Sequence, residues 1–455
     1  MSVKRKWFGT DGIRGRYEIE PMTPEFVWRI GNAAAKHFGK EKKEPVFIVG
    51  RDTRSSGYVL EDSLCRGLLA GGAQVTRLGV VPSGAVSMLA NSMGVNAGIM
   101  ISASHNDYQD NGIKFFDSKG FKLADEDELA IEQIIGEVHE VPPLSHDVPA
   151  VMEFSAEPIY LEMYKEALDK TVSSDFTLQD RTIVLDAANG AAWNSAVYIL
   201  KNYGATVKQI GCRPDGININ KSCGSMHPEA LQAEVKKYGN AIGIALDGDA
   251  DRLILVDEAG EALDGDEYLA IIGTAFLKRN ELPKKTIVAT VMSNLGLDEA
   301  VENAGGKVVR TEVGDRYVLE KMREEGYVFG GEQSGHFLFL EHAPSGDGLL
   351  SALQILDVCR TSGRPLKELR KVMKKYPQKL YNLPVSEKKP LEQLPAVQTA
   401  IKDAEQKLGS KGRLFIRYSG TENKIRVLLE NASDNGLEQL AQPVLQAIRD
   451  SIGAR

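Results

Sequence analysis

Three aspartates at alternate positions follow an apolar run in the middle of the chain. Asp247, Asp249 and Asp251 stand in Asp-Gly-Asp-Ala-Asp-Arg, directly after Ala-Ile-Gly-Ile-Ala-Leu and before Leu-Ile-Leu-Val. Three carboxylates this close repel one another unless a hard cation neutralises them, and carboxylate oxygens suit Mg²⁺. Because apolar strands on both sides would fix the loop, we favour a magnesium site over a solvated acidic turn. Arg252, which ends the loop, is a candidate substrate-binding residue.

Two other metal or phosphate motifs compete for the same loop. An EF-hand starting at Asp247 would need glycine where Arg252 stands and would absorb an evident strand, so it is rejected. A phosphatase of the haloacid-dehalogenase type would use Asp247 as nucleophile and Asp249 as acid, because Asp-x-Asp after an apolar strand also suits that chemistry. That alternative stays open.

A serine next to a histidine follows another apolar run. Ala97–Ile101 leads into Ser-Ala-Ser104-His105-Asn, at the end of an expected strand, where open α/β sheets place ligands. Ser104 is a candidate covalent phosphate carrier, although a lone serine is more often an ordinary loop residue. Lys114 follows closely and could return towards it. A hydroxyl, a lysine and a carboxylate-bound cation together make a phosphoryl-transfer site, in which charge neutralisation does most of the catalysis.

Two weaker motifs lie at either end of this set. Gly9-Thr-Asp-Gly-Ile-Arg14-Gly is a glycine-rich turn with one guanidinium. Gly330-Gly-Glu332-Gln-Ser334-Gly-His336 follows an expected strand, and if it is extended, its three functional side chains point to one side. A carboxylate, a hydroxyl and an imidazole so placed suit hydrogen bonding to sugar hydroxyls. Each motif, standing alone, is about as well explained by a plain loop.

The last motif resembles an anion-binding nest. It comprises Arg417, Ser419, Gly420 and Thr421, with Arg426 beyond. Backbone N–H groups, two hydroxyls and a bidentate guanidinium fit a phosphate dianion. Such a loop in a small terminal domain favours a lid that closes on the ligand. There is no Walker A loop and no GxGxxG fingerprint, so neither a P-loop nucleotide site nor a Rossmann dinucleotide site is supported.

The elements that position these motifs alternate between strands and helices. Short apolar runs such as 46–49, 74–80, 182–186, 206–210, 286–290 and 307–310 are separated by amphipathic segments, which favours an α/β fold with parallel sheets. The pattern occurs three times and is followed by a small α+β unit with strands near 413–416 and 425–429. We predict domains at 1–155, 156–258, 259–372 and 373–455.

Composition excludes several classes of protein. The 455 residues carry 55 basic and 63 acidic side chains, a net charge of −8, which argues against a nonspecific nucleic-acid binder. With 42% hydrophobic residues the chain is not disordered. Four dispersed cysteines indicate no disulfide scaffold, and no apolar run is long enough for a membrane span or signal peptide. We expect a cytoplasmic enzyme that has no nucleic-acid or membrane partner.

In this order, the five motifs resemble those of the α-D-phosphohexomutase family over nearly the whole chain. Four segments resemble the sequence motifs of the bacterial subgroup acting on glucosamine phosphates. They are Thr10-Asp-Gly-Ile-Arg14, Ile101-Ser-Ala-Ser-His-Asn106, Gly112-Ile-Lys-Phe-Phe116 and Gly331-Glu-Gln-Ser-Gly-His336. The resemblance implies three related α/β domains with mixed or parallel sheets and a small C-terminal α+β domain around a central cleft.

The resemblance also implies a mechanism and roles. The reaction would interconvert glucosamine 6-phosphate and glucosamine 1-phosphate through phosphorylated Ser104 and a sugar 1,6-bisphosphate, feeding UDP-N-acetylglucosamine and cell-wall synthesis. The other readings are a phosphoglucomutase or phosphomannomutase of the same fold and a non-catalytic sugar-phosphate binding protein. A homodimer is a further expectation. The implied roles are Mg²⁺ binding by Ser104, Asp247, Asp249 and Asp251; proton transfer and charge stabilisation by His105, Lys114 and Arg14; sugar contacts by Glu332 and Ser334; and phosphate binding by Arg417, Ser419, Gly420 and Thr421.

The chain departs from the family pattern at four places. Asp107 stands where proline is usual, Ser83-Gly84 replaces Thr-Pro, Asn423 replaces proline, and Ala250 stands where glycine is commoner. None of these changes removes a chemical group from the mechanism, but the first three bear on loop geometry and substrate preference.

Overall fold

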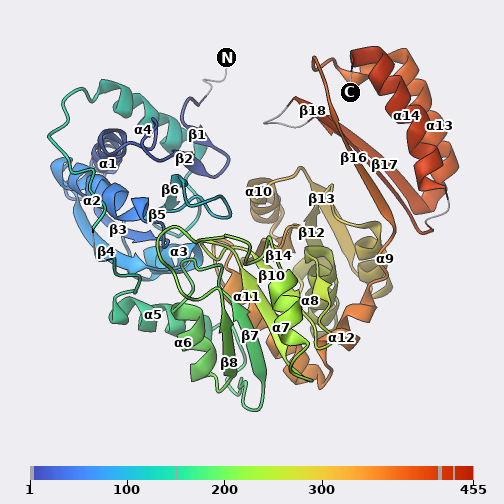
Figure 1. Cartoon of the computed structure of the whole chain (residues 1–455), viewed down its shortest axis with the longest axis horizontal. Coiled ribbons are helices and arrows are strands. Elements are labelled where there is room, and N and C mark those ends of the chain that lie inside the picture. The colour runs from blue at the N-terminus through green and yellow to red at the C-terminus, as the bar shows by residue number, and fades with distance from the viewer. Residues whose placement is uncertain (1–4, 150–151, 419–422, 434–435, 454–455) are drawn as a thin grey trace.

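The computed structural model describes residues 5–149, 152–418, 423–433 and 436–453. Four domains follow one another along the chain, each built on its own sheet (Figure 1). The first sheet has the order β1-β2-β6-β5-β3-β4. Its strands are β1 (Phe8–Gly9), β2 (Gly12–Arg16), β3 (Val46–Arg51), β4 (Gln74–Val80), β5 (Ala97–Ile101) and β6 (Asp110–Asp117). Its helices are α1 (Pro24–Phe38), α2 (Ser56–Ala70), α3 (Ser83–Ser92) and α4 (Asp125–Glu137).

The second and third domains repeat this alternation of strands and helices, with fewer strands in each sheet. The second sheet, β11-β10-β9-β7-β8, contains β7 (Thr182–Asp186), β8 (Thr206–Ile210), β9 (Ile242–Leu246), β10 (Leu253–Val256) and β11 (Ala262–Leu263). Its helices are α5 (Pro158–Asp169), α6 (Ser195–Asn202) and α7 (Glu229–Val235). The third sheet, β13-β12-β14-β15, contains β12 (Thr286–Thr290), β13 (Lys307–Thr311), β14 (Phe329–Gly331) and β15 (Phe337–Phe339). Its helices are α8 (Gly265–Arg279), η1 (Pro283–Lys285), α9 (Leu295–Asn303), α10 (Asp315–Glu325), α11 (Gly348–Ser362), α12 (Leu366–Leu369) and η2 (Arg370–Val372).

The three sheets share one local topology. In each, a central strand pairs in parallel with two neighbours, and one neighbour is followed by a strand that returns antiparallel: β5 to β6, β9 to β10, and β14 to β15. The connections between these strand pairs carry Ser104, the three aspartates, and Glu332 with His336. Three of the predicted motifs therefore occupy equivalent positions in three related domains.

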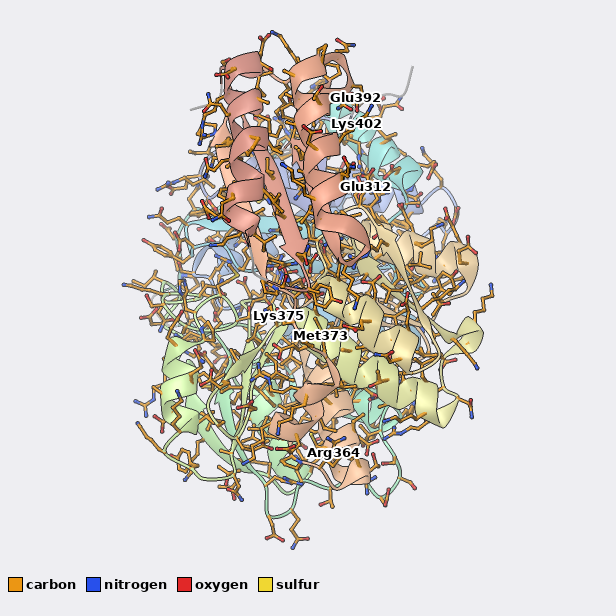
Figure 2. The ribbon with its side chains drawn as sticks, turned by 90° about the vertical axis from the view of Figure 1, so that its right-hand side faces the viewer. Glu312, Arg364, Met373, Lys375, Glu392 and Lys402 are labelled. Carbon is orange, nitrogen blue, oxygen red and sulfur yellow. The ribbon has the colours of Figure 1, made fainter. Side chains whose placement is uncertain are left out.

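The C-terminal domain is a separate α+β unit. Its sheet, β16-β18-β17, is antiparallel throughout, with β16 (Gln378–Pro384), β17 (Gly412–Tyr418) and β18 (Lys424–Asn431). The helices are η3 (Leu391–Gln393), α13 (Pro395–Leu408), η4 (Gly409–Lys411) and α14 (Leu437–Ile452), and α13 and α14 pack side by side (Figure 2). This domain has its own apolar core, which includes Val397, Val427 and Leu445.

A continuous apolar core joins the three α/β domains. It runs from Ile48 in the first domain through Leu185 in the second to Ile287 and Leu353 in the third. Because the three α/β domains bury this core together, they stabilise one another, whereas the C-terminal domain has a separate hydrophobic core. Among the described residues, no helix is long and apolar enough to cross a bilayer.

Most expected strands lie where the apolar runs predict them, and two features differ. The segment after β14 is a turn rather than an extended strand, because Gly335 has a φ of +93° and its N–H donates to Glu332 O at 3.0 Å. The second sheet also continues past residue 258, since β11 pairs with β10. The domain boundaries at 155, 258 and 372 stay predictions.

Candidate active site

The serine, aspartate and turn loops pack directly against one another. A Cβ on Gly248, in the aspartate loop, would lie 2.5 Å from Ser104 O, so only glycine permits this approach. On the other side, Leu253 N donates to Gly335 O at 2.9 Å, and a Cβ on Gly335 would lie 2.3 Å from Leu253 O. In the sequence the serine loop lies more than a hundred residues before the aspartate loop, which lies about 80 residues before the turn loop, and the fold brings all three to one site.

Ser104 lies at the centre of the contact. Its Oγ donates a hydrogen bond to Asp247 Oδ2 at 2.7 Å and lies 3.4 Å from His105 Nδ1. The residue is buried and has a φ of +52°, in the left-handed region that non-glycine residues rarely adopt. Such a conformation persists only where the surroundings hold it, which marks the loop as built for a function.

The restraint on the serine loop comes from residues that the motifs did not single out. Arg54, which is fully buried, donates to Ser104 O and Asn106 O, both at 2.9 Å, and also to Asp107 O. Its Nε donates to Asp52 Oδ2 at 2.9 Å. Asn220 from the second domain donates to Ser104 O at 2.8 Å. These partners come from elsewhere in the chain, so no local spacing signals them, although Arg54 does stand in the turn after an apolar strand.

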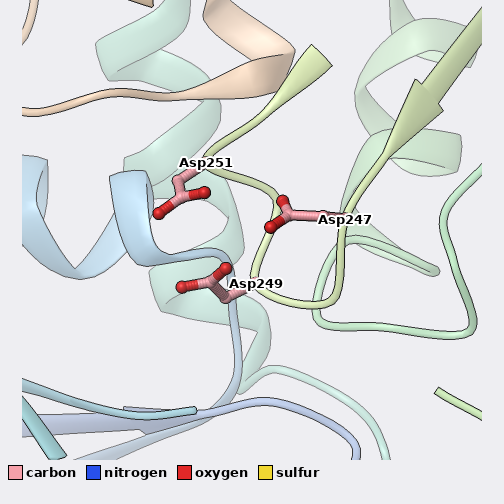
Figure 3. Close-up of side chains that lie close together, drawn as sticks. All are labelled: Asp247, Asp249 and Asp251. Atoms are coloured by element: carbon pink, nitrogen blue, oxygen red, sulfur yellow. The ribbon is translucent and has the colours of Figure 1, made fainter. Parts of the chain in front are cut away.

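The aspartate loop presents three carboxylates to one small volume (Figure 3). One ligand oxygen from each of Asp247, Asp249 and Asp251 lies within 4.8 Å of the others. Burial first, and then the charges of Asp251 and Asp249, raise the pKa of Asp247 to about 8. Within the described part of the chain, the buried Oδ1 atoms of Asp249 and Asp251 accept no hydrogen bond. Buried carboxylate oxygens that accept no hydrogen bond, beside a carboxyl that resists ionisation, are groups that a hard divalent cation would satisfy.

Lys114 lies beneath the aspartates rather than beside the serine. Its Nζ is 2.7 Å from Asp249 Oδ2, 3.3 Å from Asp251 Oδ2 and 2.9 Å from Asp11 Oδ2. Burial alone would lower the pKa of Lys114, but Asp11 and the two other aspartates raise it well above its ordinary value. The side chain is therefore a fixed ammonium. Ser83, which the sequence marks only as a departure from the family pattern, donates to Asp249 Oδ2 at 2.6 Å.

His105 and Arg14 flank the serine with different electrostatic characters. Burial, and then the positive charges of Arg252 and Arg14, lower the pKa of His105 to about 4. The imidazole is thus neutral near pH 7 and can accept a proton. Arg14 pairs with Asp11 and lies 3.4 Å from Ala103 O, on the wall of the cleft.

The turn after β14 forms the opposite wall. Glu332, Ser334 and His336 line a cleft of about 540 Å³ together with Ser104, Arg14 and Arg252. Although the segment is not extended, all three predicted side chains face this cleft. Glu332 Oε1 accepts a hydrogen bond from Gly314 N at 3.0 Å. Burial lowers the pKa of His336, but Asp251 and Asp315 outweigh it and raise the pKa to about 9.

The predicted phosphate-binding motif lies on the C-terminal domain. Arg417 on β17 faces Arg426 on β18 in the strand register, and neither lines the cleft. Burial, and then the charge of Arg426, lower the pKa of Arg417. Among the described residues, the buried Arg417 Nε has no acceptor, so the Arg417 guanidinium can receive an anion. Ser419, Gly420 and Thr421 lie outside the described residues.

The local structure explains three of the four positions at which the sequence departs from the family pattern. The Asp107 side chain is exposed, and its backbone carbonyl is the group held by Arg54. A Cβ on Gly84 would lie 2.2 Å from Asp347 Oδ2, so this glycine makes room for the carboxylate that caps α11. Ala250 has a φ of +60°, where glycine would be unstrained. Nothing in the described structure explains Asn423, whose backbone O accepts from Val385 N.

Comparison with known proteins identifies the class. Four family models of phosphoglucomutase/phosphomannomutase domains match in order: domain I at residues 5–141, domain II at 158–260, domain III at 264–376 and the C-terminal domain at 380–447. The chain belongs to the phosphoglucomutase/phosphomannomutase family and is a mutase of the isomerase class. The predicted fold of three related α/β domains and a C-terminal α+β domain is confirmed.

Within this family, curated bacterial relatives carry the name phosphoglucosamine mutase. The one from Geotalea daltonii is 46% identical over 451 residues and covers 99% of each chain. A family protein from Burkholderia thailandensis has the same fold, with a TM-score of 0.78, 23% identity and coverage of 97% of each chain. The N-acetylphosphoglucosamine mutase of Aspergillus fumigatus, solved with GlcNAc-6P and magnesium, has a TM-score of 0.66 at 20% identity, covering 98% of this chain and 96% of that one.

Proposed function

We propose that the chain interconverts glucosamine 6-phosphate and glucosamine 1-phosphate. The substrate assignment is supported by the 46% identity to a phosphoglucosamine mutase over 99% of each chain. The observation that carries the chemistry is the 2.7 Å contact between Ser104 Oγ and Asp247 Oδ2. It puts a candidate phosphate carrier directly on a group of carboxylates that can hold a cation.

The reaction follows from a phosphorylated Ser104. The free hydroxyl oxygen of the sugar phosphate attacks phosphorus, the bond from phosphorus to Ser104 Oγ breaks, and a sugar 1,6-bisphosphate results. His105, which is neutral, takes the hydroxyl proton in this step and gives a proton to the leaving Ser104 Oγ, which lies 3.4 Å from its Nδ1; in the second step the proton moves back by the reverse path. After the bisphosphate turns over, Ser104 Oγ attacks its other phosphate and regains the phosphoryl group, leaving the isomeric monophosphate. Arg14 stabilises the negative charge that builds up on the transferred group, and the Lys114 ammonium offsets the charge of the aspartates on which Ser104 lies.

Magnesium fits the aspartate loop. Asp247, Asp249 and Asp251, with Ser104 or its phosphate, would hold the ion, and the Oδ1 atoms of Asp249 and Asp251, which accept no hydrogen bond in the described structure, match its preference for hard oxygen ligands. Bound there, Mg²⁺ would neutralise the carboxylates and withdraw charge from the phosphoryl oxygens.

The two ends of the substrate need separate contacts. Glu332, Ser334 and His336 face the cleft and suit the sugar hydroxyls, and Arg252 beside them suits a phosphate or ring oxygen. The phosphate that is not transferred would be bound by Arg417 and Arg426, with Ser419, Gly420 and Thr421. A single fixed anion site can accept either end of the bisphosphate, which is what the turnover of the intermediate requires.

The haloacid-dehalogenase alternative loses support from this geometry. Asp247 is completely buried beneath Ser104, whose hydroxyl bonds to it. A nucleophile must reach the phosphorus of its substrate, and in this arrangement Ser104 stands between.

The decisive experiment follows the phosphoryl group. Ser104→Ala should abolish both turnover and the covalent phosphate, which intact-mass measurement detects as about 80 Da on the peptide containing Ser104. The exposed Ser145→Ala serves as the matched control. Normal isomerisation by Ser104→Ala, or label on Asp247 with release of inorganic phosphate, would refute the mechanism. Comparable rates on mannose 6-phosphate would instead defeat the amino-sugar assignment.

Two further expectations concern the protein in the cell. The cytoplasmic location that the sequence analysis predicts and the expected homodimer both stay predictions. A product that feeds UDP-N-acetylglucosamine synthesis suits the first of them. Light scattering of the purified protein tests the second.

A further inference from the structure

Six acidic and basic side chains form a closed ring at the floor of the cleft. Three come from the first domain, one from the aspartate loop of the second, and two from the third. In order around the ring they are Asp11, Lys114, Asp251, His336, Asp315 and Lys122. Acidic and basic members alternate, so each lies between two members of opposite type.

Each link is a contact of ion-pair length. Lys114 Nζ lies 2.9 Å from Asp11 Oδ2 and 3.3 Å from Asp251 Oδ2. His336 Nδ1 lies 3.8 Å from Asp251 Oδ1, and its Nε2 lies 3.5 Å from Asp315 Oδ2. Lys122 closes the ring because its Nζ contacts Asp315 Oδ2 and lies 2.6 Å from Asp11 Oδ1.

Lys122 is the member that joins the first domain to the third. It follows the hairpin after β6, where it bridges back to Phe116, and its ammonium lies between one carboxylate from each domain. Without that charge, Asp11 and Asp315 would be two partly buried anions with no cation between them. Asp11 would keep Lys114 and Arg14 as partners, and Asp315 would keep His336. Taking one partner from a buried ionic cluster is nevertheless unfavourable, because the balance of charge is lost and the two carboxylates are no longer bridged.

The position of Asp315 gives this link a function. Asp315 is the first residue of α10, next to Gly314, whose N–H donates to Glu332 in the turn loop. Asp315 also contacts His336 at the other end of that loop. A contact that restrains Asp315 therefore also restrains both ends of the Glu332–His336 loop, which faces the sugar.

We propose that Lys122 is a positioning residue, which holds the 313–315 segment and the Glu332–His336 loop at a fixed place over Ser104. This inference rests on the proposed function and names a part of its substrate-binding machinery. It predicts that Lys122 governs sugar-phosphate binding without touching substrate, and that its effect depends on the carboxylate of Asp315.

The test is a double-mutant cycle with a matched control. Lys122→Met keeps the aliphatic stem and removes the charge, Asp315→Asn removes the facing charge, and the double variant removes both. Lys119→Met changes an exposed lysine in the same turn. The measurements are kcat and KM for glucosamine 6-phosphate, calorimetric affinity for glucose 1,6-bisphosphate, and Mn²⁺ affinity.

We expect Lys122→Met to raise KM and weaken bisphosphate binding by about 10-fold or more, while Mn²⁺ affinity changes less than about twofold. Adding Asp315→Asn should recover part of the loss, because it removes one of the two anions that Lys122 bridged. Lys122→Arg, which keeps the charge, should rescue most of the activity. Lys119→Met should match the wild type.

Two results would overturn the assignment. One is a Lys122→Met variant that binds and turns over as Lys119→Met does. The other is a double variant whose losses simply multiply. If Lys122→Met does not fold, a folded double variant supports the charge argument, and an unfolded one assigns Lys122 to stability alone. A wild type without mutase activity counts against the proposed function, and bisphosphate affinity then still tests Lys122.

Discussion

Arg54 shows how one buried side chain can set the geometry of a reacting group. Its guanidinium donates hydrogen bonds to three backbone carbonyls of the serine loop, those of Ser104, Asn106 and Asp107. It also forms an ion pair with Asp52. A planar fork with five donors can do this, whereas a single ammonium cannot. The left-handed backbone at Ser104 is stable because these carbonyls are held.

Arg54→Lys should therefore damage catalysis without removing a charge. We expect kcat to fall by about 10- to 100-fold, because loosening the serine loop misplaces Ser104 relative to the aspartates. KM should change little, since Arg54 does not line the cleft. The exposed Arg66→Lys on α2 is the matched control. Steady-state kinetics on both variants decide the matter, and equal kcat values would show that the loop holds its shape without Arg54.

At the scale of elements, the positions of the strands could be predicted from the sequence, but the contacts that their connecting loops make with other domains could not. Apolar runs mark strands such as 97–101 and 182–186 because a strand buried on both faces must be apolar throughout. The motifs at their ends follow from the rule that open sheets bind ligands there. The turn shape of 332–336 depends on Gly335 meeting Leu253 of another domain, which no local pattern contains. Asp11, Lys122 and Asp315 were missed for the same reason.

The start of α8 links the sugar-facing loop to the loop that precedes α9. Asp266 Oδ2 accepts hydrogen bonds from Gln333 Nε2 and Asn294 N, both at 2.8 Å. Burial, and then the charge of Asp264, raise the pKa of Asp266 to about 7, against the opposing charge of Arg310. One carboxyl group thus joins two loops and changes its charge near neutral pH.

Asp266 should make the third domain less stable as pH rises. Its folded-state pKa is above the unfolded value of 3.8, so its contribution is fully present below about pH 4 and is lost as pH rises through about 7. Between these values the free energy of unfolding should fall by on the order of 1 kcal/mol per pH unit from this group. Asp266→Asn should flatten the change in melting temperature between pH 5 and 8. The exposed Glu302→Gln should leave it intact, and parallel curves for all three proteins would contradict the assignment.

At the scale of the whole molecule, the contacts among the three α/β domains differ in kind from those that hold the C-terminal domain. The three α/β domains share an apolar core and the ring of charges, so their loops keep one geometry. The C-terminal domain has a separate core and meets the third domain near the segment in which Figure 2 labels Met373 and Lys375. A polar junction between separate cores can open and close at low cost, which suits a domain that must release a bisphosphate for turnover and then bind its other end.

Glu430 is the centre of that junction. This fully buried carboxylate accepts a hydrogen bond from Leu295 N at 2.7 Å and from Arg413 Nη2 at 2.7 Å. Arg413 in turn donates to Val291 O and Ser293 O, both at 2.9 Å. The contact thus joins β17 and β18, which carry Arg417 and Arg426, to the loop between β12 and α9.

Glu430→Gln should loosen the C-terminal domain while leaving the other three intact. The amide keeps one acceptor for Leu295 but turns an N–H towards Arg413, and an unsatisfied buried donor costs about 1–3 kcal/mol. We expect a larger radius of gyration by solution X-ray scattering and a KM for glucosamine 6-phosphate about 10-fold higher, since the phosphate site would spend less time over the cleft. Glu438→Gln, an exposed change in the same domain, is the control. If scattering and KM both match this control, the C-terminal domain is held by its linker rather than by Glu430.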